Sequence, residues 1–236
     1  MIGTLLKIGA VILVTIGVSI SGLVVIVFDR SGSVYHRIAR WWARVTLRLF
    51  GVNVSVKGLD HLDPSSHYVY VSNHASLFDI PAIMAAIPDE VRIVLKKELT
   101  RVPIWGWALK LGPYISVDRN NPKDAMGSIE QATETIRNGA SVLIFAEGTR
   151  SKDGKLQPFK RGAFALAARS GVPIVPVTIN NSFRILPKGS WRIQPADISV
   201  VVDRPIESAG VMGKEDELRL MGQVHAVLEK NFVEQL

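Results

Sequence analysis

The chain has 236 residues, of which 47% are apolar, and it carries a formal net charge of +7. This length supports one full hydrophobic core and leaves little room for a second large domain. The absence of cysteine excludes a disulfide framework, a thiolate zinc site and a cysteine nucleophile.

The positive charge is concentrated near the N-terminus. Residues 1–50 contain six basic residues and one acidic residue, a net charge of +5, whereas the other 186 residues carry only +2. A basic chain often binds nucleic acid, but +2 is too small for a surface that follows a phosphate backbone. Because the excess lies beside the most apolar segment, we expect a membrane surface, and no nucleic acid, as the partner.

The first predicted element is the uncharged run of 21 residues at 8–28. About 20 apolar residues cross the hydrocarbon core of a bilayer, so the run has the length of a transmembrane helix. A cleaved signal peptide fits less well, because the run exceeds a usual apolar core and lacks a small-residue cleavage site. If the run spans, the basic residues after it predict that the rest of the chain is cytoplasmic. Its three glycines would equally allow a half-inserted hairpin.

Residues 33–50 form the next predicted element, a basic amphipathic helix. Its four arginines recur at three- and four-residue spacing, so they share one helical face. The arginines are Arg37, Arg40, Arg44 and Arg48, and the opposite side carries Ile38, Trp41, Trp42, Val45 and Leu49. This pattern is typical of a helix at a membrane interface; the alternative is an exposed helix packed on the domain. Residues 1–50 are therefore predicted to anchor the chain in a membrane.

From residue 51 to residue 236 the pattern alternates between strands and helices. This alternation predicts one α/β domain, a mixed sheet flanked by helices, rather than two domains. We predict strands near 52–57, 68–72, 91–95, 114–117, 141–145, 174–179 and 197–202. We predict helices near 80–87, 104–111, 123–138, 160–170 and 213–232, and a loop at 186–195.

His74 and Asp79 lie five residues apart, where a predicted strand gives way to a predicted helix. In a straight α-helix they would point about 140° apart. They can therefore meet only if the segment begins as a strand-to-helix turn. Pro81 fits the first turn of a helix that starts near Asp79. Spacing alone leaves open that Asp79 caps this helix and that His74 is an ordinary loop histidine.

Charged residues follow three other predicted strands. Ligands of α/β folds usually bind at the carboxyl ends of strands, and arginine binds phosphate or carboxylate through its bidentate fork. Taken singly, each residue fits a surface ion pair, but together they predict an anionic ligand near the histidine. They are Lys97 after the third strand, Arg119 after the fourth, and Glu147 and Arg150 after the fifth.

The segment NHASLFD at 73–79 resembles the NHx4D motif of the glycerolipid acyltransferases, specifically the 1-acyl-sn-glycerol-3-phosphate (lysophosphatidic acid) acyltransferases. Further blocks follow in the order of that family, and the similarity covers roughly residues 50 to 185. Ala146 departs from the family, in which proline is common there, and this should alter the turn more than the chemistry. The blocks are KEL with GW at 97–107, GPYISVDR at 112–119, FAEGTRS at 145–151, FKRG at 159–162 and VPIVPV at 172–177.

The resemblance implies transfer of a fatty acyl group from acyl-CoA or acyl carrier protein to the 2-hydroxyl of lysophosphatidic acid, which gives phosphatidic acid. A neutral imidazole suits the base that this alcohol needs, so His74 is the expected general base, with Asp79 fixing its tautomer. No metal or cofactor is implied. The residues expected to bind the acceptor are Lys97, Arg119, Glu147, Gly148, Thr149 and Arg150.

Several alternatives stay open from the sequence. Ser72 or Ser76 could act as a nucleophile, although the alcohol can attack directly. The acceptor could be glycerol 3-phosphate, another lysophospholipid or an acylated amino-acid lipid. The chain could also be a non-catalytic protein that binds anionic lipid, against which the intact His74/Asp79 pair speaks. We further expect an apolar groove or tunnel for the acyl chain.

Overall fold

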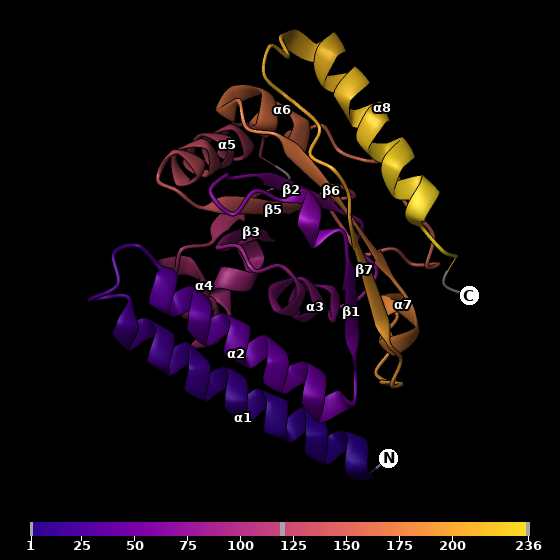
Figure 1. Ribbon diagram of the computed structural model, residues 1–236. Coiled ribbons are helices and arrows are strands. Elements are labelled where there is room, and N and C mark those ends of the chain that lie inside the picture. Colours follow the sequence, from indigo (N-terminus) through magenta and orange to yellow (C-terminus); the bar gives the residue numbers. More distant parts are fainter. Residues whose placement is uncertain (1, 119–120, 235–236) are drawn as a thin grey trace.

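A seven-stranded sheet runs through the middle of the molecule, with helices on both faces (Figure 1). The computed structural model describes residues 2–118 and 121–234. The strand order is β1-β7-β6-β2-β5-β3-β4, and neighbours are parallel except β6 and β7. The strands are β1 (Val54–Lys57), β2 (Val69–Ser72), β3 (Val91–Lys96), β4 (Ile115–Val117), β5 (Ser141–Phe145), β6 (Ile174–Asn180) and β7 (Ile198–Val202).

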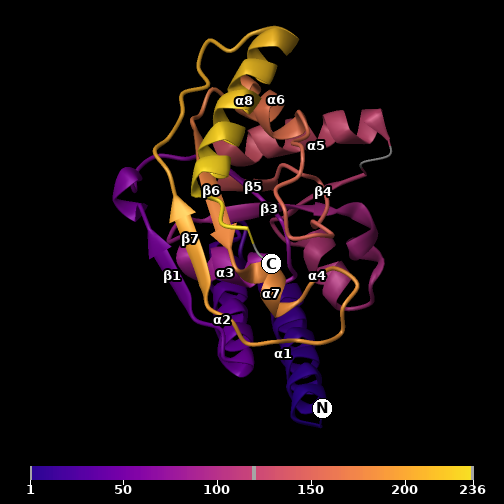
Figure 2. The same ribbon diagram turned by 90° about the vertical axis from the view of Figure 1, so that its right-hand side faces the viewer.

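One face of the sheet is covered by α1 to α4 and the other by α5, α6 and α8 (Figures 1 and 2). The helices are α1 (Ile2–Val25), α2 (Ser33–Phe50), α3 (Asp79–Ala86), α4 (Trp105–Leu111), α5 (Pro122–Arg137), α6 (Gly162–Ser170), α7 (Ser182–Ile185) and α8 (Gly213–Asn231). There are also two short 3-10 helices among the described residues: η1 (Leu59–His61) lies between β1 and β2, and η2 (Lys97–Arg101) lies between β3 and α4. Each face of the sheet thereby has its own apolar core.

The strands and helices predicted after residue 51 are present, with boundaries within two residues of those expected. The mixed α/β fold is therefore confirmed. Covering both faces explains why β6 is buried at every position, as a central strand of a mostly parallel sheet should be. The edge strand β1 alternates between half-buried and exposed positions. The short elements η1, η2 and α7 were not predicted, because segments this short show no helical period.

Helix α2 packs on the domain as well as bordering α1. Ala39, Ala43 and Leu47, spaced four residues apart, are buried on the core side of the helix. Trp41 is exposed on the opposite side, while Trp42 donates a 2.9 Å hydrogen bond from Nε1 to Thr15 Oγ1 of α1. Residues 33–50 thus form an exposed helix packed on the domain, the alternative left open by the sequence, and they also present an outer surface.

Arg40 differs from the other three arginines of this helix. Its Nε donates to the carbonyl oxygen of Met84 at 3.1 Å, and its Nη1 donates to that of Pro88 at 3.0 Å. These carbonyls lie at the C-terminal end of α3, where a cation is favourable. A helix at a membrane interface would have all four arginines among lipid headgroups, but Arg40 instead fastens α2 to α3.

Helix α1 runs alongside α2. Ile8 and Val11 pack against the core, and the ring of Tyr35 lies against Gly22, so contacts are spread along α1. By length and composition alone, Gly3–Val25 could cross a membrane, and most of its surface is uncovered. Because α1 is fastened at several points along its length, it lies along the domain rather than projecting from it.

We predict a specific acid sensitivity at His36, which is buried between α2 and the sheet. Burial lowers its pKa to about 4, the charges of Arg92 and Arg40 act in the same direction, and Glu90 opposes them. Between pH 6.5 and 4 the unfolded chain binds a proton at His36 that the folded protein does not bind. The free energy of unfolding therefore decreases as the pH is lowered through this range, by roughly 3 kcal/mol in total.

In the variant His36→Phe, urea denaturation across this pH range should show a shallower loss of stability than in the wild type. The phenyl ring is similar in size and takes up no proton. Parallel pH profiles for the two proteins would contradict this account of His36.

Candidate active site

The candidate site lies at the carboxyl edge of the parallel strands. Strand β2 lies between β5 and β6, and Ser72 at its end is level with Phe145 of β5 and Val177 of β6. The segments that follow these strands therefore leave the sheet together. NHASLFD follows β2, and AEGTRS follows β5.

His74 and Asp79 meet, as the strand-to-helix turn predicts. His74 Nδ1 lies 2.7 Å from Asp79 Oδ2, and the same oxygen accepts hydrogen bonds from the backbone N–H groups of Ala75 and Ser76 at 2.7 and 2.8 Å. The Asp79 side chain is 0% exposed and that of His74 is 16% exposed. A buried carboxylate is costly unless it is hydrogen-bonded, and these three donors supply that compensation on one oxygen.

The carboxylate of Asp79 does not cap its own helix. The N-cap of α3 is Phe78, which makes no side-chain capping bond within the described chain. Asp79 instead accepts its bonds from residues that precede the helix. The interpretation of Asp79 as a helix cap and His74 as an ordinary loop histidine is therefore wrong.

The imidazole of His74 is held on a second side by Phe145. The two rings stack with centroids 4.1 Å apart and planes inclined by 18°. Because the Asp79 carboxylate accepts a hydrogen bond from Nδ1, the single proton of the neutral ring lies on Nδ1 and Nε2 carries the lone pair. The arrangement suits a base that accepts a proton at Nε2.

The AEGTRS turn forms hydrogen bonds with both the N–H and the carbonyl oxygen of His74. The N–H of Ser151 donates to the His74 carbonyl oxygen at 2.8 Å, and the Glu147 carboxylate accepts from the His74 N–H. Across the neighbouring strand, Asn73 donates from Nδ2 to the Ile179 carbonyl oxygen and accepts the Ile179 N–H, at 2.9 and 2.8 Å. The loop after β2 is thus tied to both neighbouring strands, which fixes where His74 lies.

Glu147 is buried beside the backbone of His74 rather than exposed at the surface. Its backbone partners are the N–H groups of His74 and Gln157, and its Oε2 is buried with no hydrogen-bond partner among the described residues. Burial raises the pKa of Glu147 to about 8, and the nearby charges of Asp79 and Asp153 add to that rise. The resemblance implies contact with the glycerol part of an acceptor, whereas these contacts give Glu147 a positioning role.

The residues expected to bind an anion are spread around the same edge. Thr149 is exposed and accepts a 2.9 Å hydrogen bond from Lys188 Nζ, which also contacts the Arg150 carbonyl oxygen. Lys97 pairs with Asp124 of α5 at 2.8 Å rather than with the His74 loop. Arg119 lies outside the described residues.

Lys160 is a site residue that the sequence analysis did not single out, although it lies in the FKRG block. Its side chain crosses Gly148, which has a φ of +73° and would bring an added Cβ within 2.8 Å of the lysine Cδ. Glycine is suited both to this left-handed backbone and to the close approach. Lys160 thereby places a cation beside the AEGTRS turn.

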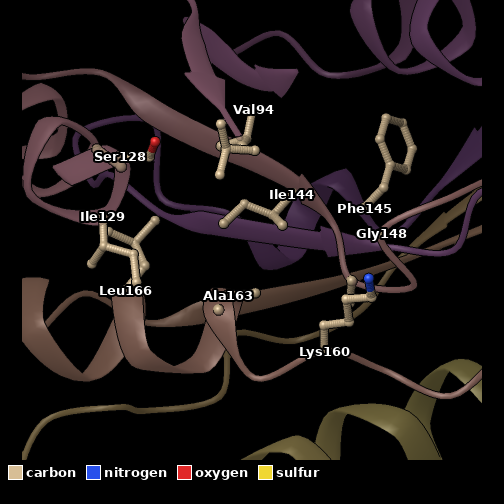
Figure 3. A pocket seen from close by; sticks show the side chains of 13 residues that line it. Val94, Ser128, Ile129, Ile144, Phe145, Gly148, Lys160, Ala163 and Leu166 are labelled. Carbon is tan, nitrogen blue, oxygen red and sulfur yellow. The ribbon is translucent and has the colours of Figure 1, made fainter. Parts of the chain in front are cut away.

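An apolar cavity of about 220 Å³ opens beside this lysine (Figure 3). Gly148 and Lys160 lie at one end, and Ile129 and Leu166 lie at the other. The cavity runs between the sheet and the helices α5 and α6. The other lining residues are Val94, Val117, Ser128, Ala132, Ile144, Phe145, Ala146, Gly162 and Ala163.

The hydroxyl groups of Ser72 and Ser76, the two serines near His74, both donate hydrogen bonds to backbone carbonyl oxygens. Ser76 Oγ donates to the Leu186 carbonyl oxygen at 3.1 Å, and Ser72 Oγ donates to that of Asn73 at 3.1 Å, and both residues are buried. Within residues 2–118 and 121–234, no group of three or more histidine, aspartate and glutamate side chains is arranged to hold a metal ion.

Residues 53–180 match the sequence model of a family described as Acyltransferase. The chain is 38% identical over 186 residues to the chloroplastic 1-acyl-sn-glycerol-3-phosphate acyltransferase BAT2 of Brassica napus, which covers 77% of this chain and 53% of that protein. It is 36% identical over 175 residues to a 1-acyl-sn-glycerol-3-phosphate acyltransferase of Pseudomonas aeruginosa, covering 74% and 66%. The chain spans about half the length of the plant relatives it matches.

The fold is also similar to a solved structure. The crystal structure of the 1-acyl-sn-glycerophosphate (LPA) acyltransferase PlsC from Thermotoga maritima superimposes with a TM-score of 0.73, and the match covers 95% of both chains. At 24% sequence identity this likeness concerns the fold. It includes the N-terminal helices, because the coverage leaves only a small part of the chain unmatched.

We predict that the buried carboxyl group of Glu147 makes folding sensitive to rising pH. With a folded pKa of about 8 and an unfolded value near 4.5, Glu147 keeps a proton in the folded protein that the unfolded chain has lost. The free energy of unfolding therefore falls as pH rises through this window.

The wild type should lose this stability as the pH rises from 5 to 8, whereas the variant Glu147→Gln, which has no proton to lose, should not. The stability of the variant minus that of the wild type should therefore increase over this range, by up to roughly 4 kcal/mol. Urea denaturation at both pH values measures this gain. The exposed Glu215 of α8 supplies the control variant Glu215→Gln, for which we expect no such change. If Glu147→Gln instead lost stability equally at both pH values, the ionised carboxylate would be the form that the fold requires.

Proposed function

The chain belongs to the Acyltransferase family, and from this membership and the site geometry we propose that it acylates the 2-hydroxyl of lysophosphatidic acid. The donor is an acyl thioester, acyl-CoA or acyl carrier protein, and the product is phosphatidic acid for phospholipid biosynthesis. The observation that carries the proposal is the His74–Asp79 pair with Nε2 left for the substrate. The names of relatives such as those from Brassica napus and Pseudomonas aeruginosa support the acceptor.

In the proposed reaction His74 Nε2 takes the proton of the acceptor 2-hydroxyl as its oxygen attacks the thioester carbonyl carbon. A C–O bond forms, the resulting tetrahedral intermediate collapses, and the C–S bond breaks. The imidazolium returns the proton to the departing thiolate, so the base is regenerated. Asp79 stabilises the imidazolium by accepting the Nδ1 hydrogen bond, as the acid does in a Ser–His–Asp triad.

No covalent acyl-enzyme is needed in this scheme, since the substrate alcohol takes the place of a serine. The buried positions and existing bonds of Ser72 and Ser76 support direct attack. The oxyanion of the intermediate needs N–H donors. The N–H groups of Ala75 and Ser76 already donate to Asp79, and that of Gly148 donates to Phe145, so we infer that the donors come from elsewhere in the site.

We assign the acceptor phosphate to the cations around the AEGTRS turn. Arg150 and Lys188 lie together there, because Lys188 Nζ contacts Thr149 and the Arg150 backbone. Lys160 crosses Gly148 in the same turn. Arg119, at the end of β4, is proposed to join them. Lys97 would have to give up its bond with Asp124 to do so.

We further propose that the cavity beside Lys160 receives part of the donated acyl chain. Its lining is almost entirely apolar, and Gly148 of the AEGTRS turn lies at one end of it. Ligand pockets usually measure roughly 300–1,000 Å³, so a cavity of about 220 Å³ would hold one segment of a long chain. The remaining chain would lie against the protein surface or in lipid.

The N-terminal helices support association of the protein with a membrane surface. Helix α1 is long and apolar enough for the hydrocarbon region, but it is fastened along α2. We therefore propose that α1 lies within one leaflet rather than across the bilayer. The exposed Arg37, Arg44 and Arg48 of α2 would contact headgroups of the cytoplasmic leaflet, which is the anionic one.

The first test is acyl transfer from a long-chain acyl-CoA to lysophosphatidic acid in vesicles, with wild type and His74→Ala compared. We expect phosphatidic acid from the wild type and a loss of at least about 100-fold in the variant, because a positioned base contributes roughly 10²–10⁴ in rate. Equal rates would remove His74 from the chemistry.

Acyl carrier protein as donor, and glycerol 3-phosphate or other lysophospholipids as acceptors, are measured in parallel. Faster transfer to one of these acceptors would reassign the substrate without changing the mechanism. The variant Ser76→Ala separates the two mechanisms: we expect less than a tenfold loss and no acyl-protein by mass spectrometry, whereas a serine nucleophile predicts a loss like that of His74→Ala.

Narrowing the cavity should shift acyl selectivity toward shorter chains. We predict this for Ala163→Leu, which points a larger side chain into the cavity, and the opposite shift for Leu166→Ala. The control is Ala167→Leu, an equally buried alanine of α6 that does not line the cavity. The measurement is competition between acyl-CoA donors of different length, with thermal denaturation as a check on folding. The same selectivity in all four proteins would exclude the cavity as the acyl site.

A further inference from the structure

Helix α4 presents an apolar face that no described part of the chain covers. Trp107 is 51% exposed and Leu111, one turn further on, is 60% exposed. Lys110, three residues beyond Trp107, is exposed on the same side, since residues three and four apart share a helical face. Pro103, just before α4, is exposed as well. We call these four residues the α4 face. Exposed Val102 and Arg101 extend it toward η2.

The α4 face is held rigidly. An added Cβ at Gly106 would collide with the backbone of Leu99 and Thr100, so α4 is packed directly on η2. Tyr35 Oη donates to the Ala108 carbonyl oxygen at 2.8 Å, which fastens α4 to α2. Ile104, just before α4, has a φ of +64°, a strained backbone for a β-branched residue. The fold thus accepts local strain to start α4 in this orientation.

The α4 face continues the exposed surface of α1. Tyr35 joins the two, because its ring lies against Gly22 of α1 and against Gly112 at the end of α4. Beyond Gly22, the side chains of Val24, Val27 and Phe28 are exposed. Both views show α4 beside the end of α1 that leads into α2 (Figures 1 and 2). Helix α4 therefore lies next to the last turns of α1, and both helices carry exposed apolar side chains there.

We propose that the α4 face is a second membrane contact, which enters the headgroup and upper acyl region of the same bilayer that holds α1. Tryptophan and leucine beside lysine and arginine form the composition of an interfacial surface. Lipid is the partner that this face fits, because the exposed Lys110 and Arg101 add cations that suit anionic headgroups. This proposal rests on the proposed position of α1 within one leaflet and not on the acyl-transfer chemistry.

A second contact changes how the domain is oriented. Contact through the neighbouring helices α1 and α2 alone leaves the domain free to roll about the direction of these helices. Helix α4 follows η2 at the carboxyl end of β3, and this is the edge of the sheet on which His74 lies after β2. Contact through α4 would stop the roll and hold this edge of the sheet toward the bilayer.

The chain has no cysteine, so a single introduced thiol can report on each surface. The variants Trp107→Cys and Leu111→Cys are labelled with an environment-sensitive fluorophore and reconstituted as full chains into vesicles of phosphatidylcholine and phosphatidylglycerol. We expect a blue-shifted emission, quenching by spin-labelled lipid and protection from aqueous iodide. The control is Met212→Cys, which is 80% exposed just before α8, at the end of the molecule far from α1 (Figure 1).

Labels at residues 107 and 111 that remain as accessible to iodide as the label at 212 would overturn the proposal. A blue shift that depends on protein concentration in detergent, without lipid, would also overturn it, because a second copy would then cover the face. The double variant Trp107→Ser/Leu111→Ser, which carries no label, should bind vesicles about tenfold or more weakly than the wild type. None of these measurements uses acyl transfer, so failure of the proposed chemistry would be seen separately.

Discussion

The Asp79 carboxylate is the interaction on which the site depends. One buried oxygen accepts hydrogen bonds from the His74 ring and from two backbone N–H groups of the turn before α3. The same contact therefore shapes the turn, orients the imidazole and selects its tautomer. Removing the carboxylate would leave two buried N–H groups without partners as well as a free ring. The geometry of the His74–Asp79 pair and the local folding of the turn thus depend on the same carboxylate.

The neighbouring strands complete that constraint. Asn73 ties the loop to β6, while Ser151 and Glu147 hold the two sides of the His74 peptide from β5. A protonated Glu147 is the form that burial favours, and a neutral side chain avoids a second negative charge beside Asp79. The turn after β5 thus holds the His74 backbone through Ser151 and Glu147, while Lys188 and Lys160 lie against the same turn.

The N-terminal helices are part of the folded domain rather than a detachable anchor. Helix α2 contributes to the core on one side, and α1 lies along α2 with most of its own surface uncovered. Tyr35 links α1, α2 and α4 through one ring. A bilayer that accepts α1 would therefore hold the whole domain at its surface, together with the edge of the sheet that carries His74.

The sequence by itself predicted the elements, and the resemblance of its NHASLFD motif predicted the pairing of His74 with Asp79. Strand and helix periods follow from local side-chain patterns, and the five-residue spacing of His74 and Asp79 excluded a straight helix between them. The tertiary structure decided the rest. The place of β2 between β5 and β6, the burial of Glu147 and the pairing of Lys97 with Asp124 depend on contacts between distant segments. The sequence also could not tell which side of α2 meets protein, because a protein core and a lipid leaflet are both apolar and select the same residues.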